Sequence, residues 1–171
     1  MPVHVLRLGH RIFRDKRITT HLFLTSRAFG AQKGYYTGEK DAKLEETILK
    51  TSKAWGGEFA IEHIQNPRSF VSNYGGEIAH LTVYGLPADK MIAEIRKHKK
   101  LLVIVGGEKV PYDFYKMADW NIAIGAQPHS EVSSLAIFLD RYFAGMQFSK
   151  KFNNARLKII GQERGKKVLR L

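Results

Sequence analysis

The sequence predicts an α/β fold with a mainly parallel sheet that carries helices on both faces. Apolar runs of strand length alternate with amphipathic segments of helical period, a pattern typical of βαβ units. Two runs, 101–105 and 120–124, are almost continuously apolar, which indicates strands buried on both faces. The chain has 171 residues and no convincing linker, repeat or low-complexity tract, so we expect a single domain over residues 1–171.

The N-terminal region predicts a strand, a loop and a helix. The strand covers residues 3–8, and residues 10–17, with the sequence HRIFRDKR, are expected to form a basic loop. Thr19 or Thr20 is then placed to cap a helix that runs to Phe29.

The middle of the chain continues the alternation. Asp41 is a suitable N-cap for a helix that extends to Trp55. On that helix, Glu46 and Lys50 have the i,i+4 spacing of an ion pair. The remaining elements of this region are strands at 33–37, 59–64 and 78–84, a short helix from Pro67 and a helix from Asp89 to about Lys97.

The C-terminal part predicts one long helix and one hairpin. A polar hinge with Pro111 and Asp113 separates the two buried strands. The helix that follows Glu131 carries its apolar residues on one face: Leu135, Phe138, Leu139, Tyr142 and Phe143. Residues 157–160 and 167–171 flank a polar turn, which predicts a β-hairpin within a C-terminal extension at residues 149–171.

Composition excludes several classes of protein. The chain has no cysteine, which rules out disulfides, thiolate nucleophiles and zinc sites built on cysteine. No run of about 18 apolar residues exists, and the N-terminus lacks an apolar signal core, so we expect a cytoplasmic protein that does not enter the membrane.

Positive charge is concentrated at the two ends of the chain. Of the net charge of +12, residues 1–17 carry +4 and residues 149–171 carry +7. Such clusters are typical of proteins that bind a polyanion, most often nucleic acid. Solubility, or the charge-rich surface of a heat-stable protein, would also require charge but would not require its segregation.

Two glycine-bearing loops follow the two buried strands. The carboxyl ends of parallel strands meet at one edge of a sheet, and ligands of open α/β folds bind there. The pair Gly106-Gly107 fits neither a Walker loop nor a dinucleotide-binding fingerprint, and taken alone it indicates only a sharp turn. A second loop from Gly125 to His129 should converge on the first, and exposed backbone groups in both can hold an adenosine-like ligand.

Neither hydrolytic nor metal chemistry is well supported. His129, Ser130 and Glu131 are adjacent, and adjacent side chains rarely adopt the geometry of a catalytic triad, whereas Ser130 is well placed to cap the following helix. No pair of histidines has the i,i+4 spacing of metal ligands, so we expect no metal site. His10 and His21, which flank the basic loop, are the better functional candidates.

Arginine dominates the basic N-terminus, where it outnumbers lysine four to one among residues 1–17. Because arginine is favoured over lysine for planar recognition of phosphate, these side chains predict a phosphate contact. A solvated basic face is the alternative interpretation.

Three stretches together resemble a known family. They are RLGHRIFRDKRITTH, AHLTVYGLP and VGGEKVPYDFYKMADWNIAIGAQPHSEVSSLAIFLDR. They are similar to the archaeal tRNA (cytidine-56) 2′-O-methyltransferases of the SPOUT superfamily over residues 1 to about 148. The resemblance implies a deep trefoil knot in the C-terminal part of the fold. It also implies methyl transfer from S-adenosylmethionine to the ribose 2′-oxygen of cytidine 56, in the TΨC loop of tRNA.

The resemblance also implies the residues of the cofactor site. They are Leu81 at the end of a strand, then Gly106, Gly107, Glu108, Lys109 and Val110 in the second loop, and Ile124, Gly125, Ala126, Gln127, Pro128, His129, Ser130 and Glu131 in the third loop, which would thread the knot.

For catalysis, the resemblance implies a homodimer in which an N-terminal arginine faces the cofactor of the partner. In related enzymes that arginine precedes an Ala-Phe-Gly motif, but here the corresponding position holds Leu24. We therefore assign the catalytic role to Arg17, with Arg14 and His21 as further candidates. Phe138 and Tyr142 could pack either in the core or across the dimer interface.

Two alternatives stay open at this stage. One is a non-catalytic RNA-binding protein that kept the fold and lost the cofactor. The other is a SPOUT enzyme that methylates another RNA nucleotide or a base. The intact loops at 106–111 and 124–131 argue against the first.

Overall fold

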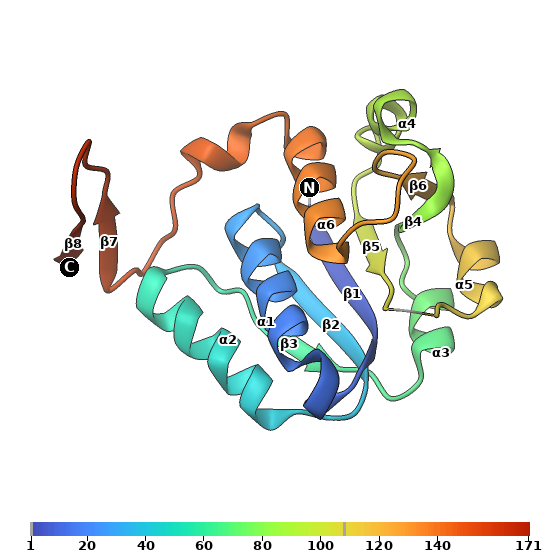
Figure 1. Ribbon diagram of the computed structural model, residues 1–171, viewed down its shortest axis with the longest axis horizontal. Helices are drawn as coiled ribbons and strands as arrows, with labels where there is room; N and C mark the ends of the chain where they lie inside the picture. The colour runs from blue at the N-terminus through green and yellow to red at the C-terminus, as the bar shows by residue number, and fades with distance from the viewer. Residues whose placement is uncertain (1, 108) are drawn as a thin grey trace.

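The computed structural model describes residues 2–107 and 109–171 and contains a six-stranded sheet (Figure 1). The strands lie in the order β3-β2-β1-β5-β4-β6, and every neighbouring pair is parallel. The predicted parallel α/β architecture is therefore confirmed. The strands are β1 (Val3–His10), β2 (Lys33–Gly38), β3 (Ile61–His63), β4 (Glu77–Pro87), β5 (Leu101–Val105) and β6 (Trp120–Ala123).

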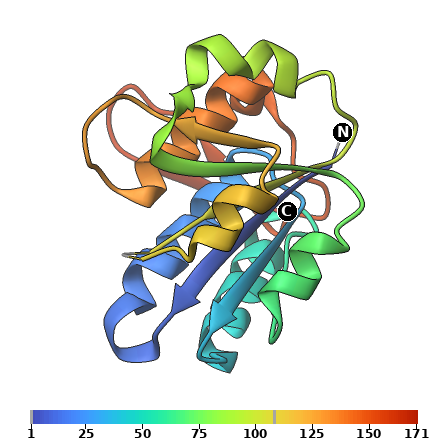
Figure 2. The ribbon, with the colours of Figure 1, turned by 90° about the vertical axis from the view of Figure 1, so that its right-hand side faces the viewer.

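Helices cover both faces of the sheet, as predicted (Figure 2). They are α1 (Ile12–Ala28), α2 (Ala42–Trp55), α3 (Pro67–Ser72), α4 (Ala88–Ile95), α5 (Tyr112–Met117) and α6 (Glu131–Phe143). Because side chains alternate along a strand, Val5 faces one cluster and Leu6 the other. The cluster around Val5 includes residues of α1, α2, α4 and α6, and the cluster around Leu6 includes residues of α3 and α5.

The predicted basic loop at residues 10–17 is wrong, because most of it is the first part of α1. The N-cap of α1 is Arg11, which makes no side-chain cap. Instead, Asp15 accepts a hydrogen bond from Arg11 N at 3.1 Å, and Glu39 accepts one from Ile12 N at 2.7 Å. The free backbone N–H groups at the start of the helix thus bond to two carboxylates, one within the helix and one in the residue that follows β2. The usual capping residue is therefore missing from the sequence. Thr19 is buried inside the helix.

Two other helices begin where the sequence predicts. Asp41 caps α2 by accepting a hydrogen bond from Leu44 N at 3.0 Å, and Lys50 pairs with Glu46 at 2.8 Å. Ser130 caps α6 by accepting a bond from Val132 N at 3.2 Å. The predicted apolar face of α6 is buried, including Phe138 and Tyr142.

The segment between β5 and β6 differs from the predicted polar hinge. Its residues Tyr112–Met117 form α5, which packs Phe114 into the core on the α3 side of the sheet. Pro111 precedes the helix as its N-cap residue. Since α5 has only one buried residue, its apolar signal is too weak to indicate a helix from the sequence.

The C-terminal extension leaves the sheet after α6. A 3₁₀ turn, η1 (Met146–Ser149), is followed by β7 (Leu157–Ile160) and β8 (Lys167–Arg170), which pair antiparallel in a separate sheet. Arg156 N donates to Ala54 O at 3.0 Å, which joins the base of the hairpin to the end of α2. Figure 1 shows the hairpin projecting from the body at the α2 side. None of the helices in the described part of the chain is both long and apolar enough to cross a bilayer.

Candidate functional site

The predicted ligand loops emerge at one edge of the sheet. Arg7 of β1 is in register with Val105 of β5, which is in register with Leu81 of β4, and Leu81 pairs in turn with Ile122 of β6. These residues therefore form one row across four strands, and the chain leaves each strand on the same side. Leu81 is buried in this row. The loop after β5 and the loop after β6 are separated by β4.

The loop after β5 is folded tightly upon itself. A Cβ atom on Gly106 would overlap Cγ2 of Val110, so a larger residue at this position fits only if the side chain of Val110 moves. A Cβ atom on Gly107 would meet only Leu8 O, at 3.7 Å. Gly107 and Lys109 are exposed, and Glu108, which the sequence places in the cofactor site, lies outside the described residues.

The loop after β6 is mostly exposed from Gly125 to Ser130. Gly125 has a φ of +73°, and a Cβ atom there would meet nothing within 4 Å. His129 crosses the loop, because its Nε2 lies 2.6 Å from Ile124 O and its Nδ1 lies 3.0 Å from Ser133 Oγ. Gln127 and Pro128 form the exposed tip.

A buried arginine joins this loop to the start of α1. Arg7 is only 1% exposed, and its Nη2 lies 3.3 Å from Glu131 Oε1 and 4.0 Å from Asp15 Oδ1. Asp15 also accepts a hydrogen bond from Arg11 Nε at 2.9 Å. Burial lowers the pKa of Arg7 and the two carboxylates oppose that effect, while its guanidinium stays charged at neutral pH. Glu131 thus has a structural partner that the sequence does not reveal.

The candidate catalytic residues lie together on α1. Arg14, Arg17 and His21 are spaced by three and four residues, so they share one face of the helix, and all three are exposed. Since β1 delivers the chain to α1 at the loop edge of the sheet, Arg14 and Arg17 lie in the helical turns closest to that edge. His10 has a different environment: it is buried and contacts Thr19 Oγ1 at 2.9 Å and Asp41 Oδ2 at 3.3 Å.

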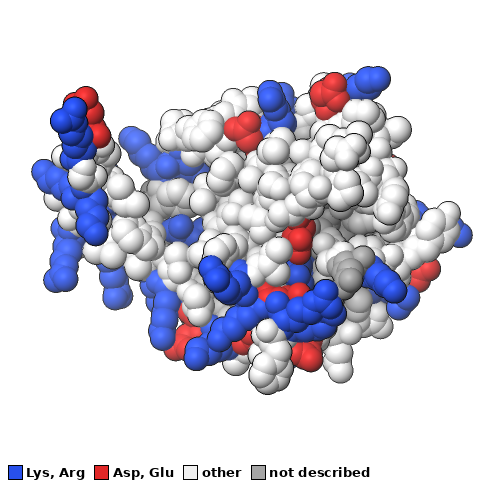
Figure 3. Space-filling model, viewed as in Figure 1, with Lys and Arg blue, Asp and Glu red and all other residues white. Residues whose placement is uncertain are grey.

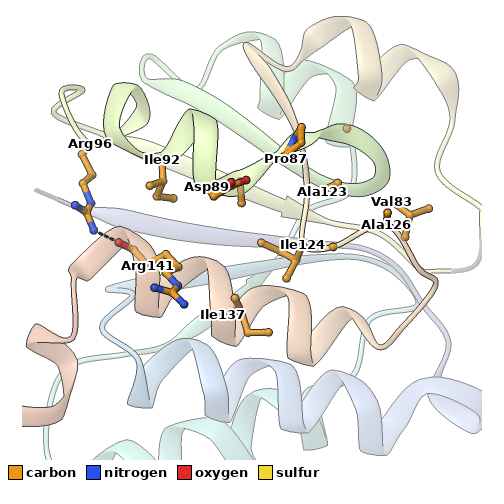
Figure 4. Close-up of a pocket in the computed structure, with 13 residues that line it drawn as sticks. Val83, Pro87, Asp89, Ile92, Arg96, Ala123, Ile124, Ala126, Ile137 and Arg141 are labelled. Carbon is orange, nitrogen blue, oxygen red and sulfur yellow. Dashed lines mark hydrogen bonds between the residues drawn. The ribbon is translucent and has the colours of Figure 1, made fainter.

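A pocket of about 720 Å³ opens between α4, α6 and the end of β6. Of the predicted cofactor residues, it is lined by Ile124, Gly125 and Ala126 only. Figure 4 shows Ile92 and Ile137 directed into it, from α4 and from α6. The other lining residues, which the sequence interpretation missed, are Val83, Gly85, Pro87, Ala88, Asp89, Arg96, Ala123 and Arg141.

Gly85 was the residue most open to prediction from the sequence. A Cβ atom on it would overlap the backbone of Asn121 and Ile122, so only glycine lets β4 return against β6. The register confirms this return, because Ile122 pairs first with Leu81 and then with Leu86. The sequence interpretation ended this strand at residue 84 and placed Gly85 in a turn, whereas β4 continues to Pro87 and Gly85 marks a bulge within it.

The pocket is suited to a small organic ligand. Its volume falls within the range of about 300–1,000 Å³ that is usual for such sites, and its lining is mainly apolar. Charged groups stand at the α4 side, where Arg96 Nε donates to Tyr142 O at 2.8 Å and thereby caps the end of α6. Within the described residues, no group of three or more His, Cys, Asp or Glu side chains could hold a metal ion.

Comparison with known proteins shows similarity of sequence over almost the whole chain. A model of the family described as tRNA ribose 2′-O-methyltransferase, aTrm56, matches residues 55–169. The tRNA (cytidine(56)-2′-O)-methyltransferase of Thermococcus kodakarensis is 50% identical, and the match covers 99% of this chain and 97% of that protein. The enzyme of the same name from Methanopyrus kandleri is 48% identical, over 98% of this chain and 96% of its own length.

Solved structures share the fold at low sequence identity. The TrmH/SpoU tRNA modifying enzyme of A. aeolicus has a TM-score of 0.62 and is 20% identical, over 86% of this chain and 76% of that one. The SpoU methyltransferase AviRb of Streptomyces viridochromogenes, crystallised with the cofactor AdoMet, has a TM-score of 0.62 and is 12% identical, over 88% of this chain and 59% of the longer one.

The first prediction concerns the tight loop after β5. Gly106→Ala should lower the free energy of unfolding by about 1–3 kcal/mol, because the added methyl group overlaps Val110. In a Val110→Ala background the same change should cost much less, since the clashing Cγ2 is gone. Chemical denaturation of the single and double variants measures this coupling, and Gly107→Ala is the matched control. Equal costs in both backgrounds would contradict the packing described here.

The second prediction concerns acid stability. Burial raises the pKa of Asp15, but the hydrogen bond from Arg11 and the charge of Arg7 outweigh burial and hold this pKa below its usual value. The carboxylate therefore stabilises the fold above the pKa of the unfolded chain, and this contribution is lost as the pH falls through the folded-state value. Asp15→Asn should destabilise the protein at neutral pH and flatten the fall in stability between about pH 5 and about pH 2.

Denaturant titrations at several pH values measure this effect. Asp113→Asn is the control, because Asp113 pairs with Arg68 at the exposed surface, 2.7 Å away. An unchanged pH profile in Asp15→Asn would show that the Asp15 carboxylate contributes nothing to the fold.

Proposed function

The chain belongs to the tRNA ribose 2′-O-methyltransferase family, and we propose that it methylates the ribose 2′-oxygen of cytidine 56 in tRNA, with S-adenosylmethionine as the donor. The observation that carries the proposal is the identity of 48–50% over almost the whole chain with relatives named for this reaction. The matched length includes both ligand loops and the basic C-terminal extension. We infer that the enzyme acts in the cytoplasm.

The proposed cofactor site is the loop edge of the sheet. It comprises Leu81, residues 106–110 and residues 124–131. Exposed glycines at 107 and 125 support it, because they allow close approach of a ligand to the backbone. The apolar pocket beside Ile124 also supports it. When bound, S-adenosylmethionine supplies an electrophilic methyl group on a sulfonium, so the reaction needs neither a metal nor a covalent enzyme nucleophile.

The proposed fold includes a deep trefoil knot in its C-terminal part, which residues 124–131 would thread. Two features support this threading. First, α6 follows β6 at one end of the sheet, yet it packs against α1, which follows β1 nearer the middle. Second, Glu131 at the start of α6 pairs with Arg7 of β1, so the loop between β6 and α6 must cross the ends of β4 and β5.

The two side chains of the third loop that could accept a proton are already engaged. Glu131 pairs with the buried Arg7, and His129 bonds to the backbone of its own loop. Arg17 is exposed on α1, near the same edge of the sheet. We therefore assign catalysis to Arg17, with Arg14 and His21 as further candidates. Arg17 would hold a phosphate beside the reacting ribose, and its charge would favour the developing 2′-alkoxide.

The proposed assembly is a homodimer in which α1 of one subunit completes the site of the other. Phe138 and Tyr142 are buried in the core of their own chain, so the apolar interface must come from other residues. Phe13 is fully exposed on α1, next to Arg14, and Ile137 is 45% exposed on α6. Ile137 lines the pocket between α4 and α6, so Phe13, beside the candidate arginines, is the apolar contact that we propose for the interface.

The proposed tRNA-binding surface includes the basic ends of the chain. Figure 3 shows Lys and Arg side chains gathered over the C-terminal hairpin and along the lower margin of the view, where Figure 1 places the start of α1. The exposed cations of the hairpin region are Arg156, Lys158, Arg164, Lys166, Lys167 and Arg170. We treat residues 149–171 as a tRNA-binding extension of the single methyltransferase domain.

Catalysis is tested first with Arg17. Arg17→Ala should lower the single-turnover rate of methyl transfer to saturating tRNA by at least 100-fold, about 2.7 kcal/mol, and leave the cofactor Kd nearly unchanged. Arg17→Lys should also be slow, because a point charge cannot reproduce a two-pronged phosphate contact. Lys16→Ala is the matched control on the same helical turn. A wild-type rate in Arg17→Ala would transfer the role to Arg14 or His21.

The non-catalytic alternative is tested by isothermal titration of the wild-type protein with S-adenosylmethionine. An enzyme should bind the cofactor with measurable heat. A folded protein that binds tRNA but gives no heat with S-adenosylmethionine would favour a pure RNA-binding role.

The extension is tested by truncation. Deletion of Arg156–Leu171 should weaken tRNA binding and reduce its dependence on salt, because each lost phosphate contact removes released counterions. Cofactor binding should change little, because the hairpin joins the body at α2, away from the ligand loops. Unchanged tRNA affinity in the folded, truncated protein would remove the extension from the tRNA-binding surface.

The dimer is tested with Phe13→Glu. A charge in place of the proposed apolar contact should shift sedimentation from dimer to monomer and abolish turnover together. Leu49→Glu is the control, because Leu49 is a comparably sized apolar residue that is 43% exposed on α2. A fully active monomer would refute the shared site.

A further inference from the structure

A second pocket lies beneath the C-terminal segment, at the end of the sheet opposite the ligand loops. It has a volume of about 460 Å³, and its lining includes Arg27, Gln32, Lys150, Lys151 and Phe152. Arg27 lies in the last turn of α1, and Gln32 precedes β2, so the pocket adjoins the end of the sheet where β1 and β2 begin. Gly57 N donates to Asn153 O at 2.8 Å and holds the segment over this pocket.

Arg27 is a buried cation without an anionic partner. It is only 8% exposed, and among the described residues no ion pair is formed by it. Its Nη2 donates to Gly56 O at 2.5 Å, and its Nε is buried with no hydrogen-bond acceptor in the described structure. A buried charge is normally paired, because transfer from water without compensation is costly.

A second cation stands beside the first. Lys150 Nζ donates to Gly30 O at 3.2 Å, and both Lys150 and Arg27 lie against the ring of Phe152, with centroid distances of 5.4 and 4.8 Å. Burial lowers the pKa of both groups, and the charge of Arg27 lowers that of Lys150 further. One carboxylate, that of the exposed Glu58, lines the pocket, and it forms no ion pair with either cation in the described structure.

We propose that this pocket binds a phosphate group of the tRNA backbone between Arg27 and Lys150. An anion there would supply the missing negative charge for both cations. An RNA backbone is favoured over a free anion, because the next pocket along the same segment is lined by four more cations, Lys50, Lys53, Arg156 and Arg170. Successive phosphates of one RNA strand would match the cations of the two neighbouring pockets. The inference rests on the proposed tRNA substrate.

The test compares Lys150→Gln with the wild type in two measurements. In the first, thermal unfolding is followed in sodium phosphate and in sodium chloride at equal ionic strength. In the second, the affinity for an unmodified tRNA transcript is measured over a range of salt concentrations. Lys90→Gln is the matched control, because it removes one exposed charge from α4.

Phosphate should raise the Tm of the wild type and of Lys90→Gln beyond the effect of chloride, and Lys150→Gln should lose this excess. The slope of log K against log salt should fall by about 0.7–0.9 in Lys150→Gln, as expected for one lost phosphate contact. Loss of the phosphate effect with an unchanged slope would identify a free-phosphate site and overturn the assignment to RNA. An unchanged slope together with an unchanged phosphate effect would overturn the site itself.

These outcomes are distinct from failure of the proposed function. If wild-type protein does not methylate tRNA, the proposed function fails, and the phosphate measurement still reports on the pocket. If the wild type methylates tRNA and Lys150→Gln binds it with the wild-type slope, only the present inference fails.

Discussion

The buried charge of Arg7 constrains the arrangement of the whole loop edge. Arg7 projects from a strand in the middle of the sheet and is only 1% exposed, so its guanidinium must be paired with carboxylates. Those carboxylates, Asp15 and Glu131, belong to the first turns of α1 and α6. Because one side chain holds both, the start of α1 and the end of the third loop cannot move apart without exposing an unpaired buried charge. The helix that carries the candidate arginines is thus fixed relative to the loop that would hold the cofactor.

The same contacts restrict what the third loop can contribute to the proposed chemistry. Glu131 is paired with Arg7, and His129 is bonded to its own loop, so both side chains hold the third loop in place. Neither is then free to act as a base. The glycines that remain exposed offer backbone atoms, which bind and orient a ligand without titrating. Positioning and a fixed positive charge then account for most of the expected rate enhancement. In the proposed function, the basic segments at the two ends of the chain bind the polyanionic substrate.

Local patterns predicted much of the fold and only part of the site. Asp41 and Ser130 were identified as caps because their signals lie within three residues of the groups they bind. The start of α1 was missed because Glu39, from beyond β2, satisfies its backbone. The role of Glu131 was equally invisible, since Arg7 is 124 residues away. The residues of α4 and α6 that line the pocket could not be predicted, because the packing of these helices is not specified by hydrophobic periodicity alone. The knot and the dimer were inferred from family resemblance only.

The most direct test of the central claim changes one oxygen atom of the substrate. Two tRNA transcripts are prepared, one with cytidine and one with 2′-deoxycytidine at position 56, and methyl transfer to each is followed by mass analysis of the nucleosides. The account predicts a single 2′-O-methylcytidine in the first transcript and no transfer to the second, which binds with similar affinity. Equal methylation of both transcripts, or a methyl group on a base, would contradict it.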